Sequence, residues 1–273
     1  MRKLLTLLIF LSATTSFAQF DTADYYFSLR ENSVENIDNA RSAYMHVARD
    51  AQGEQLAYSV QQIGRLALYE ADYLSVAGDE AKLKEIFSQC RDLAGRLEPY
   101  QPQYKTQYAY WKMTCTSNWL LYATIGERLG ALPGIKRHFN LVVDESLNVR
   151  EDAGLDLRYE GGGISRVLAA IYTNSLSNLL RNDLPNQDKA LEMIDQAIDS
   201  SPYPGTTLYG ADFYRNHSQK AQILYNSERN SDAEDFILET IEELDELIDE
   251  DALPEGLEPE SKGERQKLEE LLQ

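Results

Sequence analysis

The stretch QDKALEMIDQAIDSSP, residues 187–202, carries the pattern that decides the fold. Ala190, Ile194 and Ala197 follow one another at spacings of four and three residues, so an α-helix places them on one face. Small side chains on such a face let a neighbouring helix approach closely, and Pro202 ends the helix. The stretch therefore predicts the second helix of a two-helix hairpin.

Matching positions recur elsewhere in the chain and predict further hairpins. They are Ala221, Leu224, Ala233 and Ile237 in a following copy, and Ala71, Gly78, Phe87 and Pro99 in an earlier, degenerate copy. Helical periodicity extends along nearly the whole chain, and almost no segment alternates as a strand does. We therefore expect an all-α fold in which tetratricopeptide-like hairpins stack as an α-solenoid, rather than an irregular bundle.

The N-terminus is expected to be a signal peptide, and the rest one continuous domain. Residues 1–18 hold two basic residues, the apolar run LLTLLIFLSA, and small residues before a cleavage point after Ala18. The apolar run is too short to cross a bilayer, although an uncleaved anchor is the alternative. We expect residues 19–157 to form a helical block with the degenerate repeat, and residues 158–273 to form a tetratricopeptide-like block.

Composition limits the compartment and the partners. No later run is apolar enough to cross a membrane, which together with the signal peptide predicts an exported or secreted protein without stable membrane insertion. The formal net charge is −19, and nucleic acid or anionic lipid would be repelled by such a chain. The expected partners are therefore another protein or a small molecule, and an oligomer is compatible with both.

Catalytic and metal-binding motifs are absent from the sequence. The three histidines, His46, His138 and His217, form no HExxH pair, no CxxC unit exists, and no serine lies in a GxSxG elbow. The sequence therefore predicts a protein that catalyses nothing and has no metal and no cofactor. Cys90 and Cys115 lie on consecutive predicted helices, and two alternatives remain open for them: one disulfide, or two buried thiols.

The glycine-rich stretch RYEGGGISRVLAAIY, residues 158–172, does not fit a nucleotide-binding loop. It lacks the lysine of a P-loop, and Arg166 stands where a dinucleotide fingerprint needs its third glycine. The glycines instead predict a turn into a helix. Two interpretations remain for Arg166: its charge attracts a ligand carboxylate at the helix start, or it is paired within the fold.

Aromatic side chains form a stripe on a long predicted helix, YKTQYAYWKMTCTSNWLLYATIGERLG, which we expect to be closed by Gly130 and Pro133. The stripe consists of Tyr104, Tyr108, Trp111, Cys115, Trp119 and Tyr122. Residues at this spacing share one face of a helix. They either pack in the core or line a ligand cavity, because tyrosine and tryptophan suit surfaces that are half apolar and half wet.

The order of these motifs resembles the T-component (TatT) family associated with TRAP transporters of the bacterial periplasm. The matching positions are Tyr110, Trp111 and Trp119, then Gly161, Gly162, Arg166, Leu168, Ala169 and Tyr172, and finally Ala190 and Ala197. The resemblance covers roughly residues 50–272, and Ala169 stands where the family often has glycine.

The resemblance implies a tetratricopeptide-like periplasmic protein that contacts a transporter's solute-binding protein, or binds a hydrophobic or organic-acid ligand in an internal channel. Family members are often lipoproteins, whereas the first cysteine here is Cys90, so no lipobox is present. We therefore expect an accessory component of a TRAP-type system. The alternative is a periplasmic scaffold for protein–protein interaction without a small-molecule site.

Overall fold

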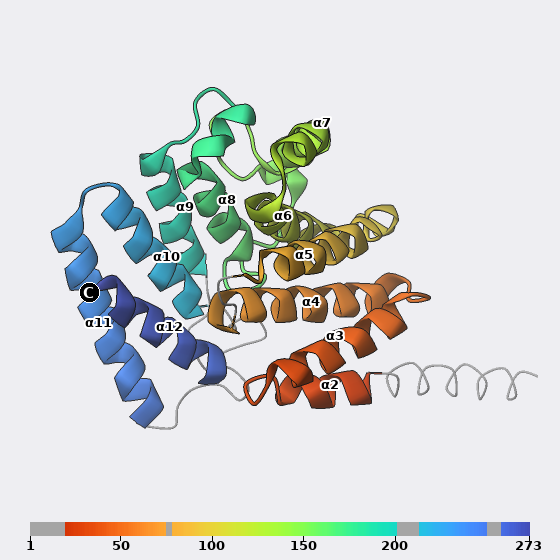
Figure 1. Cartoon of the computed structure of the whole chain (residues 1–273). Coiled ribbons are helices and arrows are strands. Elements are labelled where there is room, and N and C mark those ends of the chain that lie inside the picture. Colours follow the sequence, from red (N-terminus) through yellow and green to blue (C-terminus); the bar gives the residue numbers. More distant parts are fainter. Residues whose placement is uncertain (1–19, 75–77, 201–212, 250–257) are drawn as a thin grey trace, which may run out of the picture. The chain divides into compact units, whose positions relative to one another are not determined.

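A computed structural model describes residues 20–74, 78–200, 213–249 and 258–273 (Figure 1). The predicted signal peptide and Pro202 lie outside the described residues. Within these ranges the chain is built from helices and has no strand; only an isolated antiparallel bridge joins Val143 to Val149. The predicted all-α class is therefore confirmed.

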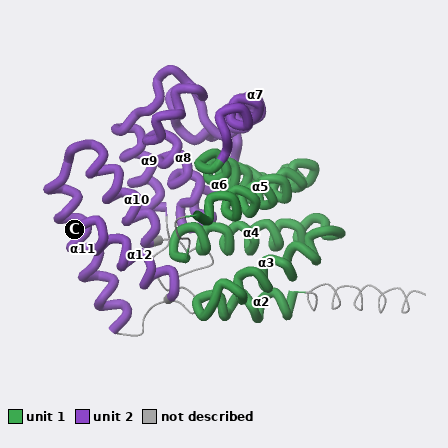
Figure 2. The backbone as a smooth tube through the Cα atoms, in the orientation of Figure 1, with its two compact units in different colours: residues 1–122 green, residues 123–273 purple. Residues whose placement is uncertain are grey.

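The chain divides into two compact units, residues 1–122 (unit 1) and residues 123–273 (unit 2), which Figure 2 colours separately. In unit 1 each α-helix packs against the next, and α4 also contacts α6. Its described elements are α2 (Asp21–Ser28), α3 (Val34–Ala48), α4 (Gly53–Tyr69), η1 (Glu70–Leu74), α5 (Glu80–Gly95), η2 (Glu98–Tyr100) and α6 (Lys105–Tyr122). The junction predicted between residues 157 and 158 falls inside unit 2.

A carboxylate holds the first helices of unit 1 together. The hydroxyl groups of Tyr44 and Tyr58 both donate to Oδ1 of Asp24, at 2.5 and 2.8 Å. Burial raises the pKa of Tyr58 to about 12 and lifts the pKa of Tyr44 well above its usual range. Both tyrosines therefore keep their protons at neutral pH and act as hydrogen-bond donors that tie α3 and α4 to α2.

Helices α5 and α6 are joined by a disulfide between Cys90 and Cys115, whose Cα atoms lie 5.7 Å apart. That separation is within the range that disulfides require.

The disulfide between Cys90 and Cys115 closes a loop of 25 residues, and we expect replacement of both cysteines by serine to lower the free energy of unfolding by about 3 kcal/mol. Urea unfolding measures this loss. Two reactive thiols in the denatured, unreduced protein would contradict the bridge.

The long aromatic helix ends earlier than the sequence analysis predicts. Helix α6 stops at Tyr122, and a new helix, α7 (Ile125–Val142), runs through Gly130 and Pro133. The cause is a capping box in which Thr124 and Glu127 satisfy each other's backbone N–H groups. The prediction that Gly130 and Pro133 close the helix is wrong because this start signal at Thr124 outweighs them.

In unit 2, helix α9 packs against α8 and α10, and α12 contacts both α10 and α11. The described elements are α7, η3 (Glu151–Ala153), α8 (Gly163–Thr173), η4 (Ser175–Leu179), α9 (Gln187–Ser200), α10 (Phe213–Asn226), α11 (Asn230–Asp249) and α12 (Glu258–Leu271). The alanine-centred face of α9 is buried: Ala190, Ile194 and Ala197 are fully covered. Stacking of such hairpins into a solenoid stays a prediction.

Candidate functional site

The glycine-rich stretch forms a tight joint that precedes α8. Gly161 and Gly162 have φ values of 58° and 79°, and Glu160 also has a positive φ of 51°. A Cβ atom at Gly162 would lie only 2.7 Å from the Cα of Ala197 on α9. The structure therefore brings together two positions that sequence patterns single out separately, and only glycine fits at this approach.

Arg166 belongs to the interior of this joint. Its side chain is 4% exposed, and Nη1 donates to the carbonyl of Glu160 at 3.2 Å and to Oδ1 of Asn216 at 3.0 Å. Asn216 in turn donates from Nδ2 to the carbonyl of Gly161 at 2.7 Å. Of the two interpretations, these contacts favour pairing within the fold, because the guanidinium fastens α10 to the glycine turn.

The predicted aromatic stripe lies in unit 1, and most of it is buried. Tyr108, Trp111, Cys115 and Trp119 are covered, whereas Tyr122 is partly exposed and Tyr104 precedes the first residue of α6. Tyr110, which lies beside the stripe, is buried as well. Helix α6 is covered around most of its circumference, so burial does not single out one face.

Neighbouring helices supply the packing around the two tryptophans. Trp111 packs on Gly64 of α4, where an added Cβ would lie 2.9 Å from the ring atom Cη2. The guanidinium of Arg91 lies 4.4 Å from the centre of the Trp119 ring. The contacts at these tryptophans are those of core residues.

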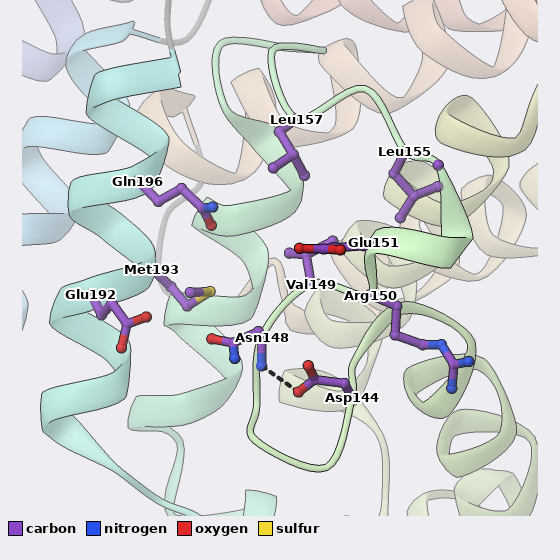
Figure 3. A pocket seen from close by; sticks show the side chains of 11 residues that line it. Asp144, Asn148, Val149, Arg150, Glu151, Leu155, Leu157, Glu192, Met193 and Gln196 are labelled. Atoms are coloured by element: carbon purple, nitrogen blue, oxygen red, sulfur yellow. Dashed lines mark hydrogen bonds between the residues drawn. The ribbon is translucent and has the colours of Figure 1, made fainter.

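A pocket of about 410 Å³ lies in unit 2, between the loop that follows α7 and helix α9 (Figure 3). None of its residues is a site residue predicted from the sequence. The lining consists of Asp144, Asn148, Val149, Arg150, Glu151, Gly154, Leu155, Leu157, Glu192, Met193 and Gln196. Its volume falls in the range of about 300–1,000 Å³ that ligand pockets usually have.

One wall of the pocket is a turn, residues 143–149, with a closed internal hydrogen-bond network. Asp144 Oδ1 accepts from the backbone N–H groups of Ser146 and Asn148, at 2.8 and 2.9 Å. The bridge between Val143 and Val149 closes the base of the turn. This Asx arrangement fixes the backbone locally.

Three side chains from outside the 143–149 turn anchor it. The hydroxyl of Tyr172 on α8 donates to the carbonyl of Leu147 at 2.8 Å, and Nη1 of Arg181 donates to the carbonyl of Asp144 at 2.7 Å. From α9, Lys189 Nζ donates to Oδ1 of Asn148 at 2.6 Å. The wall is therefore preformed, and binding would not require its ordering.

The pocket combines an apolar surface with acidic groups. Met193 is buried, and Val149, Leu155 and Leu157 are partly buried; these side chains supply the apolar area. Gln196 is held by a hydrogen bond from Ser165 Oγ to its Oε1, at 2.9 Å. Three carboxylates, those of Asp144, Glu151 and Glu192, complete the lining.

The cation in the lining is already engaged. Arg150 makes a two-bond pair with Asp152, at 2.9 and 2.6 Å, and its hydrogen bond lowers the pKa of the Asp152 carboxyl below the usual value. In Figure 3 its guanidinium points away from Met193 and Gln196. The positive charge of Arg150 is therefore compensated outside the pocket centre.

Sequence reasoning missed this pocket because no motif marks it. Asp144, Ser146 and Asn148 signal a turn, but a turn alone indicates no cavity. The opposite wall comes from Glu192, Met193 and Gln196, more than forty residues later, and only the fold brings the two segments together.

Comparisons with known proteins give no family. No family model matches the chain, and no curated protein matches it. Across the described ranges, no helix is long and apolar enough to cross a membrane. In the same ranges, no three His, Cys, Asp or Glu residues are grouped so that they could hold a metal ion. The class of the protein therefore rests on its structure, an all-α chain with a preformed pocket in unit 2.

Proposed function

We propose that this protein is a non-catalytic periplasmic binding protein, an accessory component of a TRAP-type uptake system, that holds a small organic ligand in the pocket of unit 2. The observation that carries the proposal is the preformed pocket itself. Its wall is held by hydrogen bonds from Tyr172, Arg181 and Lys189, three side chains of the same unit. A site that needs no ordering on binding is suited to capture a ligand from dilute solution.

The motif residues of the sequence support the pocket. Tyr172 and Gly162 belong to the stretch on which the resemblance to the T-component family rests, and both help to position the two segments that form the walls of the pocket. Tyr172 anchors the 143–149 turn, and Gly162 lets α8 start close against α9, which carries Met193 and Gln196. In this proposal the motif builds the site, and other residues contact the ligand.

Native mass spectrometry of the protein isolated from its own periplasm tests the proposal. We expect a bound small molecule on the unaltered protein, and its loss on Leu155→Trp, because the partly buried Leu155 lines the pocket and an indole would fill it. Asp199→Trp is the matched control, since Asp199 is exposed on α9 outside the lining. Absence of a bound molecule, with no solute-binding protein retained during purification, would contradict the proposed function.

A second candidate function, a protein-interaction scaffold, is favoured by helix α7. Its exposed side carries Ile125 and Leu129 together with Gly126, Gly130 and Gly134, and nothing lies within 4 Å of a Cβ added at any of the three glycines. Exposed glycines inside a helix cost about 1 kcal/mol each relative to alanine. A helix of a protein partner, approaching closely over the glycines, would account for them.

The exposed basic residues of α7 indicate the charge expected on a helix that docks there. Lys136 and Arg137 are exposed on α7, so the flanks of the docking helix are expected to be acidic. We expect Leu129→Glu to lower the amount of co-purifying partner at least tenfold without changing the free energy of unfolding. Leu238→Glu on α11 is the control, because the exposures of Leu129 and Leu238 are 55% and 56%. Equal retention by both variants would remove α7 as the docking face, and a shift in sedimentation would identify a second copy as the partner.

A further inference from the structure

The charge balance of the unit 2 pocket indicates which ligands it accepts. Arg150 is neutralised by Asp152, and Lys189 lies 2.7 Å from a carboxylate oxygen of Glu192, so each of these cations is matched by an anion. Glu151 has no ion-pair partner among the described residues, and Asp144 Oδ1 accepts only from neutral backbone N–H groups. Arg181, which donates to the backbone carbonyl of Asp144, is itself paired with Asp183, and Arg150 is shared between Asp152 and the weaker attraction of Asp144. The lining and its neighbours therefore keep an excess of negative charge, which is largest at Glu151.

The negative potential of this pocket is strengthened by the rest of the chain. The formal net charge is −19, and the field of a whole chain adds to the local field of a concave site. A carboxylate ligand would approach Asp144 and Glu151 against repulsion, because the Arg150 guanidinium points away from the pocket centre (Figure 3). The lining thus opposes an organic acid and attracts a cation.

The apolar part of the pocket lining indicates that the uncharged part of the ligand is apolar. Val149, Leu155, Leu157 and Met193 provide apolar contacts, and Gln196 is fixed by Ser165. An inorganic cation would leave this apolar area unused, and the described residues include no group that could hold a metal ion. A molecule with one charged end and an apolar body uses both kinds of surface.

Resting on the proposed function, we propose that the pocket binds a small organic cation, a protonated amine with an apolar body. The ammonium group lies near Glu151 and Asp144, and the apolar body lies against Met193, Leu155 and Leu157. Hydrogen bonds from an ammonium to a carboxylate are stronger than those between neutral groups, so the charged end selects the ligand. This ligand class differs from the organic acid, one of the two ligand classes that the family resemblance implies, and shares an apolar body with the other, a hydrophobic ligand.

Three probes of nearly the same shape test the charge of the ligand: tryptamine, which is a cation, tryptophol, which is neutral, and indole-3-acetate, which is an anion. We expect calorimetric titration at low salt to give at least tenfold tighter binding of tryptamine than of tryptophol, and no binding of indole-3-acetate. Raising the salt to 0.15 M should weaken tryptamine binding and leave tryptophol unchanged, because salt screens charges that are partly exposed.

Glu151→Gln identifies the carboxylate that selects the cation. We expect it to weaken tryptamine binding about three-fold, the size of an exposed charge pair, and to leave tryptophol binding unchanged. Glu239→Gln makes the same charge change at an exposed position of α11, outside the lining, and should have no effect. Selective weakening by Glu151→Gln alone supports the assignment.

The outcomes separate this inference from the proposed function. Tighter binding of indole-3-acetate or tryptophol than of tryptamine would overturn the cation assignment and leave a ligand pocket standing. Equal effects of Glu151→Gln and Glu239→Gln would overturn it as well, because the selection would then come from net charge alone. If no probe binds, and Leu155→Trp removes no molecule from the isolated protein, both the inference and the proposed function fail.

Discussion

Gly162→Ala is expected to lower the free energy of unfolding of unit 2 by about 3 kcal/mol or more, for two independent reasons. Gly162 has a φ of 79°, in the left-handed region that costs an L-residue about 1–2 kcal/mol. The added Cβ would also lie 2.7 Å from the Cα and 2.9 Å from the carbonyl carbon of Ala197. These are backbone atoms of α9, so the clash is relieved only if α8 and α9 separate.

Urea unfolding followed by circular dichroism measures this loss, and a second glycine provides the control. Gly134→Ala changes the same residue type inside α7, where nothing lies within 4 Å of the added Cβ. We expect that variant to be up to about 1 kcal/mol more stable, because alanine is the better helix former. Equal unfolding free energies for Gly162→Ala and the unaltered protein would contradict the close approach of the glycine joint to α9.

The helices could be predicted from the sequence because their pattern is local. The spacing of Ala190, Ile194 and Ala197 requires no knowledge of distant residues, and the structure buries all three on α9. The end of α6 was predicted wrongly although its signal is also local: Thr124 and Glu127 form a capping box that outweighs Gly130 and Pro133 downstream. At this boundary the start signal at Thr124 decides where the new helix begins, and the glycine and the proline further along do not end it.

The pocket could not be predicted, for a physical reason. Its two walls come from the 143–149 turn and from α9. Tyr172 and Arg181 hold the turn from other segments, and the hydrogen bond from Lys189 joins the turn to α9. Such contacts join segments that are far apart in the sequence, and no regular spacing of residues in a single sequence indicates them. The glycine joint is an intermediate case, since the turn was predicted from its glycines but its partner Asn216 was not.

Trp111→Ala is expected to lower the free energy of unfolding of unit 1 by about 3–5 kcal/mol, the usual loss when a buried aromatic ring is removed from a core. Trp111 is fully buried, and its ring occupies the space that a side chain at position 64 would need. Leu121→Ala, at a side chain that is 56% exposed on the same helix, should change stability by less than about 0.5 kcal/mol. Urea unfolding of the two variants measures both effects.

A double substitution then distinguishes packing from cavity lining at Trp111. Gly64→Ala alone places a Cβ 2.9 Å from Cη2 of the ring and should destabilise unit 1, although alanine is the better helix former. In the Trp111→Ala background the clash is gone, so the same change should be neutral or stabilising, and the two effects should not add. A tryptophan facing an open cavity would move aside, and Gly64→Ala would then act alike in both backgrounds. Non-additivity therefore assigns Trp111 to the core of unit 1, where its ring fills the groove that Gly64 opens on α4.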